Sequence, residues 1–424
     1  MNRLFSSLTE LEPLDEDMRY LRHALHRQPE LAFAEEETAR EVAARLRDYG
    51  YEVHTGIAGT GVVGVLRAGG GTRSIGLRAD LDALPITEEN GFAHASCVPG
   101  RMHACGHDGH TAMLMGAARH LARTRRFDGT LNLIFQPAEE RGYDSGAKRM
   151  VEAGLFERFP CDAVFGMHNH PGQPQGRLMF RAGDFMAAGD RVFITIEGKG
   201  GHAARPHQTH DPVVAAAAIV TALQTVVARN VDPSRAAVVT VGMLNGGHAP
   251  NVIPHRVQMS LSVRSFDADT RALLRRRIET LVSMQAASFE VEAKIDYVEG
   301  YPVVHNHAAE TAFAIEVARE VVGEANVEAN MEPLMGSEDF AYLLQARPGC
   351  FLRIGNGPAT GGRVLHSPTY DFNDDNLVVG AAYWSRLVER YLRPRARLSR
   401  ASRQARWRPG GTRRRLGRQV GRHG

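Results

Sequence analysis

Residues 101–110 read RMHACGHDGH, and this segment constrains the fold more than any other part of the 424-residue chain. It holds three histidines, one cysteine and one aspartate, and it lacks the apolar–polar period of a packed strand or helix. Thiolate, imidazole and carboxylate groups together suit zinc and its divalent neighbours. The segment predicts a metal-binding loop, and the alternative is a polar loop that happens to be rich in histidine.

Other segments place ligand-type side chains at the end of an apolar run or in a loop. They are LNLIFQPAEE (131–140) with Glu139 and Glu140, AVFGMHNH (163–170) with His168, and VLHSPTYDF (364–372) with His366. In open α/β sheets, catalytic groups gather at the carboxyl ends of the strands. We therefore expect these side chains to meet the 101–110 loop at one edge of a sheet.

Strand-like and helix-like stretches alternate along the first part of the chain and again near its end. The expected strands are 61–66, 74–79, 131–135 and 162–167, and the expected helices are 15–49 with a break near Gln28, 109–124, 145–153, 308–322 and 374–392. This alternation predicts an α/β fold, in which a catalytic domain is built on a largely parallel mixed sheet.

The pattern changes between Gly183 and Gly300. Here we expect strands at 190–197, 236–241, 255–263 and 289–297, and helices at 211–229 and 267–286. Such units predict a compact α+β sandwich. The sequence therefore predicts an inserted domain at 184–299 that moves as a lid on glycine hinges, between two catalytic segments at 1–183 and 300–392.

The net charge of +3 conceals two very different regions. Residues 393–424 contain twelve arginines and no acidic residue, so residues 1–392 alone carry a net charge of −9. The basic tail has no apolar period and is predicted to be disordered. It could touch RNA, DNA or anionic lipid without specificity, but we favour a dispensable extension because the acidic body gives nucleic-acid binding no support.

Three further features predict a cytoplasmic protein with no membrane span. The first residues, MNRLFSSLTELEPLDEDM, lack the apolar core of a secretory signal. No run of 18 apolar residues occurs, and the four cysteines are too unevenly spaced for a disulfide framework. A reducing compartment would keep Cys105 available as a thiol.

The residue types allow one or two metal ions. Three or four ligands suffice for one zinc ion, whereas five or more indicate two ions that share a bridging group. Glu139 and Glu140 are adjacent, so one can bind metal while the other moves protons. The residues alone do not settle which glutamate has which role.

A resemblance to a known family rests on many segments. They are RADLDALPI (78–86), PGRMHACGHDGHTAML (99–114), FQPAEE (135–140), GMHNHP (166–171), GKGGHAARPHQTHDPV (198–213), NVIP (251–254), GSEDFA (336–341) and LHSPTYDFND (365–374). With these segments the chain resembles the M20 metallopeptidases, and most closely their amidohydrolase branch, over nearly all of residues 15–392. That branch contains hippurate hydrolases, N-acyl-amino-acid amidohydrolases and auxin-conjugate hydrolases.

The resemblance implies two divalent ions per subunit, zinc or manganese, with cobalt and nickel as alternatives. It implies that Glu139 is the catalytic base and that the ligands are Cys105, His107, Glu140, His168 and His366. The wider family has an H-x-D segment where this chain reads R-A-D-L-D at 78–82, so the usual first histidine ligand is absent. We therefore expect Asp80 and Asp82 to lie behind the ligands and orient them, the alternative being a pair that caps a turn.

The resemblance also implies roles for the inserted domain. His202 would reach the active site of the other protomer of a homodimer, or of a dimer-based oligomer, and stabilise the oxyanion. Asn251 and Arg264 would hold the carboxylate of the substrate. The alternatives are a loop histidine in a dimer interface and an ordinary charge at a strand edge. Asp108 and His110 are expected to support the ligands or to cap the helix that follows.

The sequence thus predicts a metal-dependent amidohydrolase that cleaves N-acyl amino acids, with acetyl, benzoyl or similar acyl groups. Two alternatives keep the same chemistry, namely an N-acetyl-diaminopimelate deacetylase and an aminobenzoyl-glutamate hydrolase. A third alternative, a metal-binding protein without hydrolytic activity, would have no need of Glu139.

Overall fold

The computed structural model describes residues 7–360 and 364–393, together with Gly417, Gly421 and Gly424. Two compact units divide the chain, Met1–Arg393 and Pro394–Gly424. Apart from Arg393 and the three glycines, the basic tail at 393–424 lies outside the described residues, so its predicted disorder stays a prediction. Everything below concerns the first unit.

An eight-stranded sheet forms the larger part of this unit, in the order β1-β2-β4-β3-β5-β16-β6-β15. Neighbours in the run β4-β3-β5-β16 are parallel, whereas β1, β2 and β6 join by antiparallel pairs. The prediction of a largely parallel mixed sheet is confirmed. The strands are β1 Glu52–Ile57, β2 Gly61–Ala68, β3 Ser74–Asp80, β4 Gly129–Gln136, β5 Ala163–His170, β6 Leu178–Met179, β15 Val327–Glu328 and β16 Gly349–Gly355.

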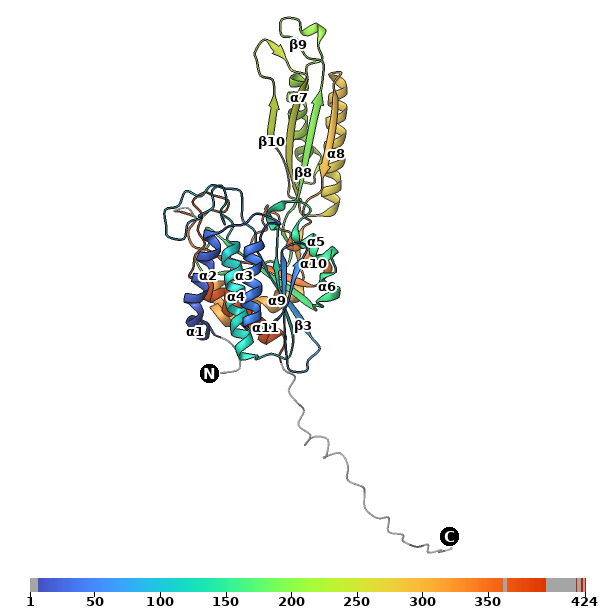
Figure 1. Cartoon of the computed structure of the whole chain (residues 1–424). Helices are drawn as coiled ribbons and strands as arrows, with labels where there is room; N and C mark the ends of the chain where they lie inside the picture. Colours follow the sequence, from blue (N-terminus) through green and yellow to red (C-terminus); the bar gives the residue numbers. More distant parts are fainter. Residues whose placement is uncertain (1–6, 361–363, 394–416, 418–420, 422–423) are drawn as a thin grey trace. The chain divides into compact units, whose positions relative to one another are not determined.

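Helices cover both faces of this sheet and bury two apolar clusters against it (Figure 1). One face carries α1 Leu8–Leu11, α2 Asp15–Arg27, α3 Glu36–Asp48, α4 His107–Thr124, α9 Ala308–Val322 and α11 Asn376–Tyr391. The other carries α5 Gly146–Glu152, α6 Leu155–Arg158 and α10 Phe340–Ala346. Helix α4 lies deepest, and Gly116 lets α2 approach because a Cβ there would overlap the side chain of Met18. Short 3₁₀ turns lie at Glu12–Leu14, Glu139–Arg141, Pro206–Gln208 and Glu324–Asn326.

A second, four-stranded antiparallel sheet is built from residues 188–298, in the order β10-β12-β8-β13. Its strands are β8 Ala188–Glu197, β10 Ala237–Gly246, β12 Arg256–Ser265 and β13 Glu292–Val298, and its helices are α7 Pro212–Asn230 and α8 Ala268–Ser288. Strand β8 alternates buried and exposed side chains along 191–196, so the helices pack on one face only. A short pair, β9 Gly201–His202 with β11 Val252–Ile253, lies beyond the sheet.

Helix α7 is long and apolar enough to cross a membrane by length and composition alone. Its buried residues, which include Ile219 and Leu223, pack into the apolar core of the four-stranded sheet. Core helices of proteins that never enter a membrane can be equally long and apolar. The buried apolar residues of α7 are therefore explained by its packing against the four-stranded sheet.

The chain passes between the two sheets at two adjacent points. Strand β7 (Gly183–Met186) still pairs with β14 (Val304–Asn306) on the side of the large sheet. Gly189 then donates its N–H to the carbonyl oxygen of Tyr301 at 3.0 Å, and a Cβ on Gly300 would collide with the backbone of Gly189. The two crossings thus lie against each other at Gly189 and Gly300.

Candidate active site

The ligand-type residues named from the sequence meet beside the carboxyl ends of the central strands. His168 lies in β5, and the turn with Glu139 and Glu140 follows β4. Cys105 and His107 lie where the chain enters α4, on either side of Gly106, which has a left-handed conformation with φ 93°. Parallel strands bring these distant segments to one edge of the sheet.

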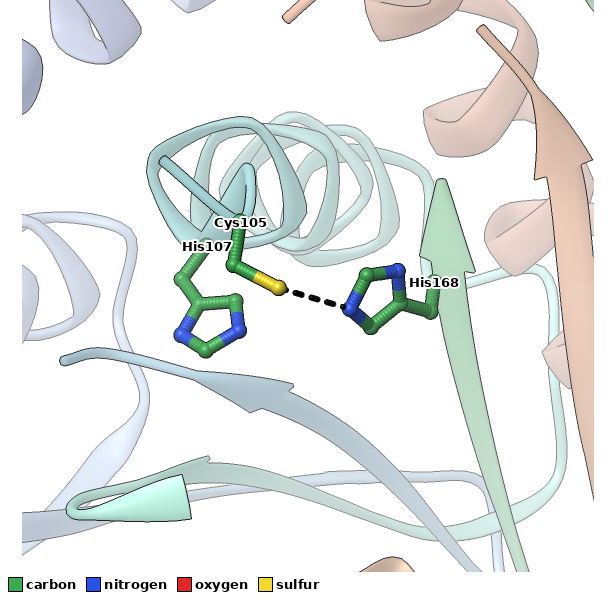
Figure 2. Close-up of side chains that lie close together, drawn as sticks. All are labelled: Cys105, His107 and His168. Atoms are coloured by element: carbon green, nitrogen blue, oxygen red, sulfur yellow. Dashed lines mark hydrogen bonds between the residues drawn. The ribbon is translucent and has the colours of Figure 1, made fainter. Parts of the chain in front are cut away.

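Among the described residues, five groups of side chains could each hold a cation, and two of them consist only of the predicted ligands and share one member. Cys105, His107 and His168 form the first group, drawn in Figure 2, in which the Sγ of Cys105 lies 3.3 Å from the Nε2 of His168. Cys105, Glu140 and His366 form the second. Within each group the ligand atoms lie within 4.8 Å of one another. Together the five side chains of these two groups would supply enough ligands for two ions.

Backbone carbonyls orient the two buried histidines. The Nδ1 of His107 lies 2.7 Å from the carbonyl oxygen of Asp82, and the Nδ1 of His168 lies 2.7 Å from that of Asn169. Each Nδ1–H therefore donates outward, which leaves the Nε2 lone pair facing the site. The Nε2 of His107 is buried without a hydrogen-bond partner among the described residues, as a ligand atom awaiting a cation would be.

The second group is strongly polar and attracts positive charge. The Nε2 of His366 lies 3.2 Å from Oε1 of Glu140. Hydrogen bonding to Cys105 and Glu140 raises the pKa of His366 to about 10. Imidazole, thiolate and carboxylate groups are all donors that zinc and its divalent neighbours accept. The donor chemistry thus fits a divalent ion at both groups.

Asp82 fixes the turn that presents the two glutamates. Its carboxylate accepts the N–H of Glu139 at 3.0 Å and that of Glu140 at 2.9 Å. Ala138, just before them, has φ 53°, and its N–H is accepted by Glu35 at 2.8 Å. Asp82 therefore lies behind the candidate ligands and also caps the turn that carries Glu139 and Glu140. The orienting role and the capping role considered from the sequence thus apply together.

Glu139 is one of the buried carboxyls of the cleft, with 6% of its surface exposed. Burial, followed by the neighbouring carboxylates of Glu338 and Glu140, raises the pKa of Glu139 well above its usual value. Tyr301 follows Gly300, where the chain returns from the second sheet. Its hydroxyl donates to the backbone oxygen of Glu139 and holds that residue in place. A carboxylate in such a place binds protons more readily than one in water.

Asp80 also lies behind the ligands, in a buried ionic cluster. Its carboxylate accepts from Arg78 at 2.8 Å and lies 2.6 Å from Nδ1 of His110. Burial alone would raise the pKa of Asp80, but His107, Arg78 and His110 lower it well below its usual value. His110 uses both ring nitrogens, on Asp80 and on Asn169, and Asp108 lies 2.8 Å from Nδ1 of His26. Helix α4 has no side-chain cap, so neither residue caps it.

A cleft of about 400 Å³ opens on the cluster. Besides the ligand-type residues, the charged and aromatic side chains that line it are Arg191, Arg264, Glu338, Tyr301 and Arg353. Sequence reasoning gave no role to the last three. Glu338 lies in the GSEDFA segment, which contributes to the family resemblance but whose residues received no role. Arg353 lies in β16, and no apolar pattern in the sequence predicted this strand.

The predicted residues of the inserted part do not all meet this cleft. Arg264 lines it and donates to Ser337 at 2.9 Å. His202 and Asn251 line a separate cavity of about 800 Å³ that Arg256 also borders. Arg256 and Arg264 lie on the same strand, β12, and eight residues of extended chain span about 26 Å. A single chain therefore does not bring Asn251 or His202 to Arg264.

Comparison with known proteins agrees with this geometry. The model of peptidase family M20/M25/M40 matches residues 76–390. A hippurate hydrolase of Campylobacter jejuni is 42% identical over 91% of this chain and 99% of its own, and an IAA-amino acid hydrolase of Arabidopsis thaliana is 41% identical over 89% of this chain and 85% of its own. A dinuclear metal-binding M20 peptidase of Bacillus subtilis superposes with a TM-score of 0.76 at 32% identity, covering 90% of this chain and 99% of that structure.

Proposed function

The chain belongs to the M20/M25/M40 peptidase family and is a metal-dependent amidohydrolase, and we propose that it hydrolyses the amide bond of N-acyl amino acids. The observation that carries this proposal is the buried carboxyl of Glu139. It lies beside five ligand-type side chains that form two possible metal-binding groups without including it. If those five side chains hold the metal, the carboxyl of Glu139 is left free to move protons. The relatives named for hippurate and for IAA–amino acid conjugates support an N-acyl amino acid as substrate.

Cys105, His107, Glu140, His168 and His366 would hold two divalent ions, zinc or manganese, with cobalt and nickel as alternatives. When bound, the ions polarise the amide carbonyl and make water acidic enough to ionise near neutral pH. Asp82 and Asp80 keep the glutamate turn and the histidines in place around them.

Glu139 is the proton carrier of the proposed reaction. It takes a proton from the water that attacks the carbonyl carbon, and it returns that proton to the amide nitrogen as the carbon–nitrogen bond breaks. The raised pKa of its carboxyl suits both transfers, since the group must accept a proton and then release it. The products are a carboxylate and a free amino acid.

Arg264 is proposed to bind the α-carboxylate of the substrate, because its guanidinium lies at the cleft and is held by Ser337. His202 and Asn251 would act in the cleft of a second copy of the chain. Strand β10 is the edge of the four-stranded sheet, and its Met243 and Leu244 are exposed, which supports a homodimer formed through this part. A cytoplasmic location remains a prediction.

The proposed function is tested with the metal-loaded enzyme on hippurate, N-acetyl amino acids, IAA conjugates, N-acetyl-diaminopimelate and aminobenzoyl-glutamate. We expect hydrolysis of at least one of the first three classes, loss of that activity on chelation and recovery on adding a divalent metal. Full activity after exhaustive metal removal would contradict the metal site. Exclusive hydrolysis of the last two substrates would replace the proposed substrate class.

A further inference from the structure

Arg353 is a buried cation on the wall of the cleft. It lies in β16 opposite His168 of the parallel neighbour β5, so both side chains leave the sheet on the same face. Only 4% of its surface is exposed, and it lines the same cleft as Cys105, Glu139 and His168. The guanidinium therefore borders the place where the proposed reaction occurs.

Among the described residues, no carboxylate lies within ion-pair distance of Arg353. One amino group approaches the carbonyl oxygen of Asn169 at 3.4 Å, the other approaches the sulfur of Met186 at 3.0 Å, and Nε is buried without a partner. These contacts are weak for a guanidinium. Burial accordingly lowers the pKa of Arg353.

Arg78 shows what a satisfied buried arginine looks like in this same molecule. Its guanidinium contacts Asp80, Glu338 and Asp339 at 2.8–3.0 Å. The charge of Glu338 favours that of Arg353, but Glu338 makes its ion pair with Arg78 and none with Arg353 among the described residues. A buried charge without a partner is strongly destabilising, and two divalent ions nearby would increase the repulsion.

We propose that Arg353 receives a second anionic group of the substrate, in addition to the α-carboxylate expected at Arg264, so that the preferred substrates are dianions. This inference rests on the proposed function and deepens it by naming a substrate class. A guanidinium that faces an open cleft with unused N–H donors is suited to bind a carboxylate there. The second carboxylate could come from the far end of the acyl group or from the side chain of an acidic amino acid.

Two pairs of nearly isosteric substrates distinguish these sources. N-succinyl-leucine is compared with its terminal amide, and N-acetyl-glutamate with N-acetyl-glutamine. We expect the dianion of one pair to have a kcat/KM about 10- to 150-fold higher than its neutralised partner, as for one charge-assisted hydrogen-bonding group. Arg353→Met and Arg353→Gln should abolish this preference. Arg347→Met, which removes a charge near the start of the same strand but outside the cleft, should keep it.

A binding measurement provides an answer even if none of these substrates is cleaved. Glutarate should raise the Tm of the metal-loaded wild type more than glutaric monoamide does, and Arg353→Met should remove that difference. Equal hydrolysis within both pairs, together with equal Tm shifts, would overturn the role of Arg353 and leave the proposed function intact. No hydrolysis of any N-acyl amino acid would instead refute the proposed function, and the Tm comparison would then decide on Arg353 alone.

Discussion

The cluster at the strand ends and the cavity that contains His202 and Asn251 are opposite kinds of site. At the strand ends, one chain supplies all five ligand-type residues and the carboxyl of Glu139, most of them buried and held by hydrogen bonds. In the cavity, His202 and Asn251 are exposed, and none of the five ligand-type residues lines it. A centre whose candidate ligands all come from one chain thus coexists with a second set of candidate groups, for which we propose a partner chain.

The first prediction concerns the part that one chain completes, and it has the largest expected effect. Glu139→Gln should lower kcat by about 10²–10⁴-fold or more while metal stays bound, because a base is lost but no ligand is. Cys105→Ala should instead release metal, since both candidate groups share the thiolate. Activity and metal content measured on the same samples separate these outcomes. Metal loss from Glu139→Gln but not from Glu140→Gln would reverse the roles of the two glutamates.

The second prediction tests whether the other part works across two chains. His202→Ala should lower kcat by about 10²–10³-fold, as for loss of one oxyanion donor. An equal mixture of His202→Ala and Glu139→Gln chains, unfolded and refolded together, should regain about a quarter of wild-type activity, because half the dimers are mixed and each has one intact site. If His202 acted within its own chain, no mixed dimer would contain an intact site and the mixture would stay inactive.

Arg264 lies at the cleft end of β12, and the third prediction uses an exposed lysine of the same four-stranded sheet as its control. Arg264→Met should lower kcat/KM for N-acyl amino acids by about 10- to 150-fold and should affect the corresponding amino-acid amides much less. Lys294→Met removes an exposed charge on β13 that pairs with Glu197 at 2.8 Å and should leave the ratio of acid to amide unchanged. Equal wild-type rates on acid and amide would exclude the carboxylate contact.

The fourth prediction has the smallest effect and concerns how firmly the single-chain cluster is held. Asp82→Ala should weaken metal affinity by about 10- to 100-fold, because the turn with Glu139 and Glu140 loses both amide contacts. Asp128→Ala is a matched control, since Asp128 also accepts two backbone N–H groups, those of Gly70 and Gly71, away from the cleft. Titration with a chelator measures both variants. Equal affinities would mean that the turn keeps its shape unaided.

The helices and strands predicted best from the sequence are those whose apolar residues recur at a regular spacing. Helix α4 and strands β3, β4 and β5 were expected within a few residues of their observed bounds. Strand β16 was not expected, although it is as short and as buried as β3, which was predicted in spite of its own buried arginine, Arg78. A charged residue within the run therefore does not explain why β16 was missed.

Residue types identified the candidate ligands, but tertiary structure decided their surroundings. Nothing local to R-A-D-L-D indicates that Arg78 would pair with Glu338 and Asp339, about 260 residues further along the chain. Likewise, Asn251 and Arg264 are close in sequence, but an extended strand carries them apart. Local patterns specify elements and chemistry, whereas partners across the fold depend on packing that a single sequence does not display.

The position of β16 in the large sheet has a consequence for synthesis on the ribosome. This strand inserts between β5 and β6, both of which precede it by more than 150 residues, and the loop after it carries His366. A nascent chain that has not yet exposed this stretch contains Cys105, His107, Glu140 and His168 but can neither close the sheet nor present the fifth ligand. Translation order alone thus keeps the complete centre from forming until almost the whole enzyme has emerged.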